Sequence, residues 1–187
     1  MNMLEVKLKN KTVVIAAFPG MGKTYYKNNC NGFTVSDSDS SQFSWTTDEE
    51  GNKVRNPEFP NNYIEHIKSL IGKVDFIFVS THEAVLKALI ENDIYFFLVY
   101  PPKSSKNMMI QRYKDRGSDE SFIKVISDNY DNWIDNLDKN YRDVVICAGR
   151  PMLGDKYVSD FIKSYLLDYE GNIYSNHDMF YSLEYFM

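Results

Sequence analysis

The sequence predicts an α/β protein in three layers, with helices on both faces of a five-stranded parallel sheet. Two observations lead to this fold class. Short apolar runs rich in Val, Ile and Phe lack clean alternation, which is typical of strands covered on both faces. Segments with helical periodicity separate these runs, and strands that alternate with helices favour right-handed crossovers and parallel pairing.

The expected strands follow the apolar runs in chain order. The runs TVVIAAF, DFIFVS, IYFFLVY and VVICA are strongly apolar, whereas GFTVS is weaker. Strands are therefore predicted at Thr12–Phe18, Gly32–Ser36, Asp75–Ser80, Ile94–Tyr100 and Val144–Ala148.

Helical patterns fill the intervals between and after these strands. They are expected at Lys23–Asn29, Asn61–Ile71, His82–Asn92, Lys106–Asp115, Glu120–Leu137 and Lys156–Leu167. In the longest of these helices, apolar residues recur every three or four positions. They predict a stripe that faces the core, made of Phe122, Ile126, Tyr130, Trp133 and Leu137.

The composition is that of one globular domain. The chain has 187 residues, of which 43% are hydrophobic and 25% charged, as is typical of soluble proteins. Cys30 and Cys147 have neither metal-ligand nor redox spacing, which favours a reducing compartment. The N-terminus has no apolar run of signal-peptide length, and Ile94–Tyr100 is too short to cross a bilayer. We therefore expect a cytoplasmic protein without a membrane partner.

Three segments differ from the rest of this domain. Residues 38–60 form a long polar connection, and long connections in compact domains are often functional. Residues 103–120 include five basic side chains and one acid between Lys103 and Arg116, although the net charge of the chain is −5. Residues 168–187 hold four acids and no Lys or Arg. An anionic ligand is expected at 103–120, whereas the overall acidity disfavours extended nucleic acid as a partner.

The residues after the first predicted strand have the composition of a phosphate-binding loop. Glycines let backbone N–H groups surround phosphate oxygens, a Lys reaches the β- and γ-phosphates of ATP, and a Ser or Thr hydroxyl binds Mg²⁺. The run Pro19-Gly20-Met21-Gly22-Lys23-Thr24 supplies these groups between a predicted strand and a predicted helix. Ala17 stands where the general pattern has its first glycine. The alternative is a strand-to-helix turn that contains these residues by chance.

Two carboxylates, Asp37 and Asp39, are expected at the carboxyl end of the second strand, where open α/β sheets bind ligands. One can deprotonate an acceptor hydroxyl, and the other can hold Mg²⁺ through water. Thr24 and Asp37 are the metal candidates, but the division of roles between the two aspartates stays open. The alternative is a polar turn, since Asp and Ser favour turns. Asp75 opens its strand rather than closing it, so its position is wrong for a metal ligand.

A basic helix that ends at a glycine has the layout of a kinase lid. Arg112 and Arg116 lie four residues apart, so on a helix they share one face and can close on the same phosphates. Gly117 ends this helix, and Ser118 or Asp119 can cap the next. Arginines brought in by lid closure stabilise the charge of a transferred phosphoryl group. The alternative is a solvated basic helix face.

The acceptor is expected to lie under the connection 38–60. Trp45 can stack on a flat ring, and Arg55 can bind a phosphate or a carboxylate. His82 follows the third strand, where it either contacts the substrate or caps the next helix. The alternative for the connection is a surface hairpin that turns at Glu50-Gly51-Asn52, with Trp45 packed on the sheet edge.

These motifs together resemble the nucleotide and small-molecule kinases of the P-loop superfamily. The loop 17–24 and the arginine pair are similar to those of nucleoside-monophosphate kinases, and Asp37-Ser38-Asp39 resembles a triplet of shikimate kinases and polynucleotide 5′-kinases. The order DSDSS, FSW, NPEFPNNY, VSTHE and RYKDRGS resembles uncharacterised nucleotide-kinase-like proteins of phages and bacteria over residues 12–165. The chain lacks the glycine-rich loop spelling and the acceptor signature of adenylate kinases, so AMP is not indicated.

The resemblance implies a P-loop kinase fold with a helical lid, and ATP and Mg²⁺ as cofactors. It also implies that Arg150, after the last strand, lies beside the adenine of ATP, and that a phage-encoded chain works in the host cytoplasm. The expected function is an ATP- and Mg²⁺-dependent phosphotransferase that acts on a nucleotide or a similar small acceptor. The alternatives are a polynucleotide 5′-kinase and a non-catalytic, regulatory ATP-binding protein.

Overall fold

The fold is a parallel α/β sheet with helices on both faces. The computed structural model describes residues 12–141 and 157–163. Its main sheet has four parallel strands in the order β2-β5-β1-β6, namely β1 (Val13–Ala17), β2 (Val35–Asp37), β5 (Phe76–Val79) and β6 (Phe97–Val99). The predicted α/β class and the parallel pairing are confirmed. The expected fifth strand, Val144–Ala148, lies outside the described residues.

The strand order creates the kind of position at which open sheets bind ligands. After β1 the chain runs to β2 at one side of the sheet, whereas after β5 it passes β1 to reach β6 at the other side. The neighbouring strands β1 and β5 therefore send their connections in opposite directions. Ligands of open α/β sheets bind at the carboxyl ends of strands beside such a switch point. The residues that follow Ala17 and Val79 are thus in the favoured place.

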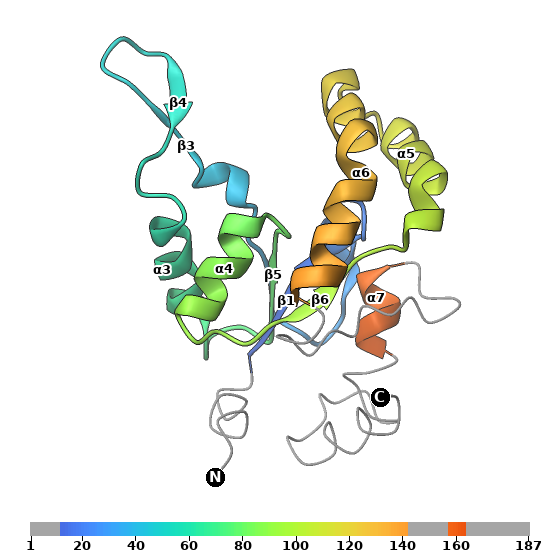
Figure 1. Ribbon diagram of the computed structural model, residues 1–187. Coiled ribbons are helices and arrows are strands. Elements are labelled where there is room, and N and C mark those ends of the chain that lie inside the picture. Colours follow the sequence, from blue (N-terminus) through green and yellow to red (C-terminus); the bar gives the residue numbers. More distant parts are fainter. Residues whose placement is uncertain (1–11, 142–156, 164–187) are drawn as a thin grey trace.

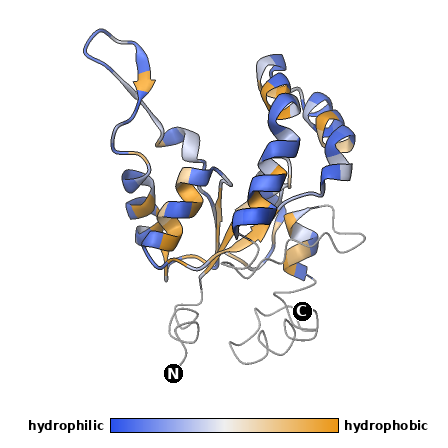
Figure 2. Ribbon diagram, in the orientation of Figure 1, coloured by the Kyte–Doolittle hydropathy of each residue, from blue (hydrophilic) through white to orange (hydrophobic). Residues whose placement is uncertain are grey.

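Helices cover the sheet on both sides. The helices are α2 (Lys23–Asn29), α3 (Asn61–Leu70), α4 (Glu83–Glu91), α5 (Lys106–Asp115), α6 (Glu120–Tyr141) and α7 (Val158–Phe161), with 3₁₀ turns η1 (Ser40–Gln42) and η2 (Lys103–Ser105). Figure 1 shows α3 and α4 together on one side and α7 on the other, where it contacts α2. Every residue of β1, β5 and β6 is buried, and the apolar sides of α3 and α4 face the sheet (Figure 2).

The helix bounds agree with the sequence prediction for α2 and α5 and differ elsewhere. Helix α6 continues past the expected end at Leu137 because Tyr141 extends its buried stripe. Helix α7 covers only part of the expected helix Lys156–Leu167, of which residues 156 and 164–167 lie outside the described ranges.

Trp133 is not a core residue, so this sequence prediction is wrong. Its side chain is 37% exposed, and the buried stripe of α6 instead consists of Ile126, Tyr130, Ile134, Leu137 and Tyr141. Successive helical residues are rotated by about 100°, so Ile134 at the centre of the stripe places Trp133 at its border. There the indole ring meets Phe18 edge-on, with 6.5 Å between the ring centroids. Trp133 therefore lies beside the end of β1 with part of its surface open to solvent.

The connection 38–60 contains the surface hairpin that the sequence left as an alternative. Strands β3 (Trp45–Thr47) and β4 (Lys53–Arg55) pair in antiparallel fashion, and Trp45 lies opposite Arg55. The turn is closed by Asp48, whose carboxylate accepts the N–H of Asn52 at 2.7 Å. In Figure 1 this hairpin and the α5–α6 pair rise on opposite sides of the same end of the sheet. Trp45 lies on the hairpin rather than on the sheet edge.

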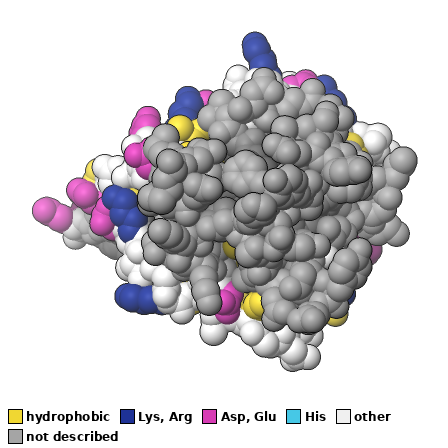
Figure 3. Space-filling view, turned by 90° about the horizontal axis from the view of Figure 1, so that it is seen from below, with side chains coloured by type: hydrophobic (Ala, Val, Ile, Leu, Met, Phe, Trp, Pro, Cys, Tyr) yellow, Lys and Arg dark blue, Asp and Glu magenta, His cyan; other side chains and the backbone are white. Residues whose placement is uncertain are grey.

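The lengths of the described helices bear on membrane crossing, and one face of the molecule shows where charged side chains lie. None of the helices in residues 12–141 and 157–163 is long and apolar enough to cross a bilayer. Acidic and basic side chains are interspersed along the visible rim of the molecule in Figure 3.

Candidate functional site

The loop between β1 and α2 follows the buried central strand and folds back on itself. Gly20 has φ 80° and Gly22 has φ 82°, a region that residues with a Cβ rarely adopt. The loop is held at its start, where the Phe18 N–H donates to the Val99 carbonyl at 2.9 Å. At its end, the Met21 carbonyl accepts the Val158 N–H of α7 at 2.8 Å. The glycines are therefore required by the backbone path, and hydrogen bonds hold the loop at both of these points.

Lys23 lies inside this loop rather than in solvent. Its Nζ donates to the Ala17 carbonyl at 2.6 Å and lies 3.4 Å from the Phe18 carbonyl oxygen. Burial lowers the pKa of Lys23 to about 8, although the charges of Asp37 and Asp39 act in the opposite direction. Burial disfavours the charged form of an ammonium, and an anion placed beside it stabilises that form. Lys23 is thus poised to pair with a phosphate.

Thr24 and Asp37 meet directly across the carboxyl end of the sheet. The Thr24 hydroxyl, in the first turn of α2, donates to Asp37 Oδ2 at the end of β2 over 2.6 Å. A hydroxyl and a carboxylate are hard oxygen donors, which suit Mg²⁺. Among the described residues, no group of three or more His, Cys, Asp and Glu side chains could hold a metal alone. This donor set fits Mg²⁺, which usually keeps waters and binds one or two carboxylates together with substrate phosphates.

Asp39 caps a turn and also affects charged groups near the loop. Its Oδ1 accepts the N–H of Ser41 at 2.9 Å and so begins η1, as expected for a polar turn. Its charge nevertheless raises the pKa values of Lys23 and His82 against the opposing effect of burial. Asp39 therefore lies within electrostatic reach of the loop while it caps a turn.

His82 lies between the loop and the hairpin. It precedes α4, and its Nδ1 is 3.5 Å from the buried Ser40 hydroxyl. The protein atoms around the ring lower its pKa, and the positive charges of Arg55 and Lys23 lower it further. The side chain of His82 makes no capping bond to α4 and keeps an exposed surface. The structure thus brings His82, Arg55 and Asp39 to one region, as the acceptor hypothesis requires.

Arg55 and Trp45 form a stacked pair on the hairpin. The guanidinium carbon lies 4.1 Å from the centroid of the indole, and Lys53 Nζ lies 5.1 Å from the same ring. Within the described part of the chain, no carboxylate lies within ion-pair distance of Arg55. An arginine that is stacked but not neutralised remains able to bind an anion.

Helix α5 packs directly against the loop, through residues that the sequence analysis missed. Tyr113 donates its hydroxyl proton to the Pro19 carbonyl at 2.7 Å. A Cβ on Gly20 would lie 2.7 Å from the Tyr113 ring and 2.9 Å from the Met109 methyl group. Met109 and Tyr113 are the buried residues of α5. Their spacing of four positions in an otherwise basic helix was the one sequence feature that could have indicated a buried side of this helix. Contact with the loop itself depends on tertiary structure.

Arg112 and Arg116 lie near the loop but have different neighbours. Arg112 stacks on the Tyr157 ring at 4.2 Å and donates to the sulfur of Met109 at 3.6 Å. Arg116 donates to the Ser118 hydroxyl at 2.7 Å. Burial raises the pKa of Tyr113, and the charges of both arginines act against this rise. The charge of Arg116 also lowers the pKa of Lys23. The structure therefore brings the arginine pair to the loop between β1 and α2.

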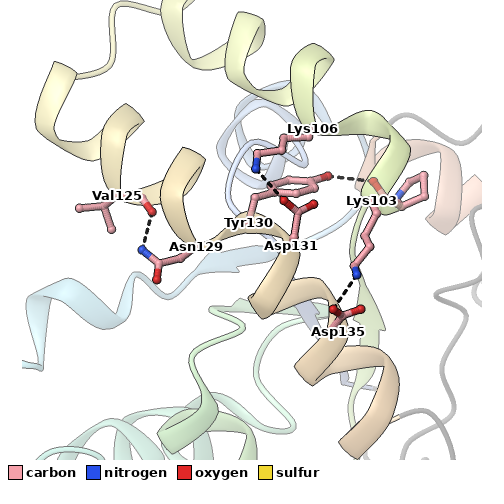
Figure 4. A network of polar contacts seen from close by, with 8 residues as sticks. Lys103, Lys106, Val125, Asn129, Tyr130, Asp131 and Asp135 are labelled. Atoms are coloured by element: carbon pink, nitrogen blue, oxygen red, sulfur yellow. Dashed lines mark hydrogen bonds and ion pairs between the residues drawn. The ribbon is translucent and has the colours of Figure 1, made fainter.

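Two of the five basic residues between 103 and 116 are neutralised. Lys103 pairs with Asp135 and Lys106 with Asp131, each at 2.6 Å (Figure 4). Tyr130 adds a bond from its hydroxyl to the Pro102 carbonyl at 3.0 Å. These contacts join residues 102–106 to α6. Fewer of these cations are thus available to an anionic ligand than the composition of the segment indicates.

The other sequence candidates have clear outcomes. Asp75 accepts bonds from the N–H and hydroxyl of Thr34 at 2.8 and 2.7 Å, before β5 begins, so its exclusion as a metal ligand agrees with the structure. Gly117 has φ 71° after α5, and Asp119 caps α6 by accepting the Ser121 N–H at 2.8 Å. Arg150 lies outside the described residues.

We expect Gly20→Ala to destabilise the protein more than Gly51→Ala. Both glycines have positive φ, so each new Cβ costs about 1 to 2 kcal/mol of backbone strain. A Cβ at Gly51 meets no atom within 4 Å, whereas a Cβ at Gly20 overlaps Tyr113 and Met109. Overpacking of this kind typically adds about 1 to 3 kcal/mol. Urea unfolding measures the difference, and equal losses in the two variants would contradict the packing of α5 on the loop.

Comparisons of this chain with protein-family models, curated proteins and solved structures gave no match.

Proposed function

We propose that this protein is an ATP- and Mg²⁺-dependent phosphotransferase of the P-loop kinase type, acting on a nucleotide or a similar small acceptor. One observation carries the proposal. The bond between Thr24 and Asp37 places a hydroxyl and a carboxylate together beside a glycine loop that encloses Lys23. Nucleotide binding needs all three elements at one point, and a chance turn would not bring the end of β2 to the start of α2 in this way.

On the donor side, the loop binds the phosphates of ATP. Backbone N–H groups of residues 20–24 surround the phosphate oxygens, and Lys23 exchanges its carbonyl partners for the phosphates. Thr24 and Asp37 hold Mg²⁺, which neutralises phosphate charge when bound. Because Asp37 bonds Thr24, it takes the metal side, and Asp39 is left as the base.

On the acceptor side, the hairpin and His82 hold the second substrate. Arg55 binds an anionic group of the acceptor, and Trp45 offers an apolar surface beside it. Asp39 removes the proton of the acceptor hydroxyl as that oxygen bonds to the γ-phosphorus of ATP. The bond between the γ-phosphorus and the bridging oxygen breaks, and ADP leaves with the bond electrons. The proton on Asp39 then passes to solvent.

We expect Arg116→Ala to depress kcat more than it weakens ATP binding. Contacts made mainly in the transition state affect turnover rather than ground-state affinity. Arg116→Lys should restore little activity, because an ammonium cannot form the two parallel bonds of a guanidinium. Lys114→Ala is the matched control, since Lys114 is an exposed cation of the same helix. Steady-state kinetics decide the outcome, and an unchanged kcat in both Arg116→Ala and Arg112→Ala would return the pair to a solvated helix face.

The proposed function is tested by acceptor-dependent release of ADP from Mg-ATP. The acceptors are nucleosides, nucleotides, small hydroxy acids and a short oligonucleotide with a 5′-hydroxyl, with a reaction without acceptor as control. Release that requires a small acceptor, and that falls in Arg55→Ala through a raised KM, supports the proposal. Release with the oligonucleotide alone would favour a polynucleotide 5′-kinase. ATP binding without transfer to any acceptor would favour a regulatory protein and contradict the proposal.

A further inference from the structure

The triplet that carries the two aspartates is part of an alternating run of five residues, Ser36-Asp37-Ser38-Asp39-Ser40. Neighbouring residues of an extended chain point to opposite sides. Ser38 is 4% exposed and Ser40 is 1% exposed, whereas Asp37 and Asp39 are accessible. Ser38 and Ser40 therefore face the protein interior, and the aspartates face the candidate site.

Ser38 is held at three separate atoms. Its N–H donates to the Phe78 carbonyl of the neighbouring strand at 2.9 Å. Its carbonyl accepts the hydroxyl proton of Tyr63 at 2.6 Å, and its own hydroxyl lies 3.1 Å from His66 Nε2. The Ser36 hydroxyl, 3.0 Å away, continues this chain of bonds. Ser38 therefore has a partner at its N–H, at its carbonyl and at its hydroxyl.

Both side chains that hold Ser38 come from helix α3. Tyr63 and His66 are three residues apart, so they share one face of the helix. Tyr63 is fully buried, and burial raises the pKa of its phenol, so the hydroxyl keeps its proton and stays a donor. The His66 ring packs on Phe43 with 4.7 Å between the centroids. Neither side chain can shift freely, so α3 provides a rigid support behind the triplet.

The position of Ser38 determines the geometry of both aspartates. A peptide unit is planar, so one hydrogen bond to it restrains a whole plane. The Ser38 N–H belongs to the plane shared with Asp37, and the Ser38 carbonyl belongs to the plane shared with Asp39. The bonds to Phe78 and Tyr63 thus restrain the two planes on either side of Ser38. The serine hydroxyl bond to His66 restrains the rotation between them.

We infer that Tyr63 and His66 are positioning residues that set Asp37 against Thr24 and hold Asp39 at the acceptor side. This role rests on the proposed function, because it concerns the same Mg²⁺ and acceptor groups. Side chains that hold metal ligands from behind commonly change metal affinity or activity by about 10- to 100-fold when they are replaced. Neither Tyr63 nor His66 touches the substrates in this account, so both act through the residues that they hold, Ser38 above all.

The test compares Tyr63→Phe, His66→Leu and His66→Gln with the parent. Phe removes only the hydroxyl, Leu removes the hydrogen bond to Ser38, and Gln returns an amide near the position of Nε2. The first measurement is the Mg²⁺ concentration at which ADP binding, measured by calorimetry, is half-saturated. We expect Tyr63→Phe and His66→Leu to require about 10-fold or more Mg²⁺. His66→Gln should recover much of this loss, and kcat should fall in parallel while KM for the acceptor changes little.

Two control variants separate positioning from stability. Thr12→Val removes another buried hydroxyl that donates to a carbonyl, that of Val74, over the same 2.6 Å, at the opposite end of β1. Ser69→Ala removes a hydroxyl bonded to the backbone carbonyl of His66 itself, at 2.7 Å. Both controls should keep the Mg²⁺ dependence of the parent, even where Thr12→Val lowers the unfolding temperature as much as Tyr63→Phe does.

The outcomes distinguish this role from the proposed function. If the Tyr63→Phe and His66→Leu variants do not differ from the parent in Mg-ADP binding and turnover, the positioning role is overturned and the proposed function stands. Loss of Mg²⁺ affinity to the same extent in Thr12→Val would overturn it too, since the effect would then follow stability. A parent protein that binds no ADP would overturn the proposed function and this role with it. Should Tyr63→Phe fail to fold, the pair His66→Leu and His66→Gln decides, because His66 is only partly buried.

Discussion

Replacing Asp37 with Asn is expected to lower the rate of phosphoryl transfer about 10²- to 10³-fold without unfolding the protein. The amide oxygen of Asn can still accept the Thr24 hydroxyl bond, so the local fold is kept. What is lost is the negative charge. At about 4 Å from a cation and an effective dielectric constant near 20, one charge contributes on the order of 4 kcal/mol. The measurement is kcat with saturating ATP, over a range of Mg²⁺ concentrations.

The companion variants assign the roles of the two aspartates. Asp39→Asn should lower kcat by about 10² or more, the usual scale for loss of a general base, with the Mg²⁺ requirement unchanged. Asp37→Asn should raise the Mg²⁺ requirement as well as lower kcat. Glu91→Gln is the control, because Glu91 is an exposed acid at the end of α4, away from the loop. Parent-like turnover in both aspartate variants would reduce the triplet to a polar turn.

Replacing Lys23 with Met is expected to abolish the thermal stabilisation that Mg-ATP gives the parent. A ligand at 100 times its Kd stabilises the folded state by about 2.7 kcal/mol, and this whole effect should vanish. The free protein should lose little stability. The lowered pKa of Lys23 shows that its charge is disfavoured where it lies, and Met removes that charge while keeping most of the side-chain volume. The bond to the Ala17 carbonyl is the offsetting loss.

Lys27→Met is the matched control for this experiment. Lys27 belongs to the same helix, α2, but is exposed in its last turn. It should leave both the free stability and the stabilisation by Mg-ATP unchanged. If Lys23→Met were stabilised by Mg-ATP as strongly as the parent, the loop would not be the phosphate site.

The elements and the loop were predictable because their signals are local. The continuous apolar run before the loop marks a buried strand, and the order Gly20, Gly22, Lys23, Thr24 has a direct backbone meaning. Asp37 was placed correctly at the carboxyl end of β2 from chain order alone, because parallel strands end at one edge. The bond from Thr24 to Asp37 then follows from the sheet order.

The supports of the site were not predictable, because they depend on which surfaces meet. Nothing in the chain near Tyr113 indicates that its hydroxyl bonds the Pro19 carbonyl, 94 positions away. The ion pair between Lys103 and Asp135 joins residues that sequence spacing does not relate. In the sequence, Tyr63 and His66 look like ordinary helix residues, because their importance comes from their contacts with Ser38 in the folded protein.

The central claim is that the loop 19–24 and Asp37 form one nucleotide and metal site. A crystal structure of the protein with ADP and Mn²⁺ in place of Mg²⁺ tests it most directly, because manganese gives an anomalous signal. The account predicts a manganese peak beside Thr24 Oγ1 and the Asp37 carboxylate, with the β-phosphate of ADP inside the loop and Lys23 turned from the Ala17 carbonyl to that phosphate. A nucleotide bound elsewhere, or a manganese peak away from Thr24 and Asp37, would contradict it.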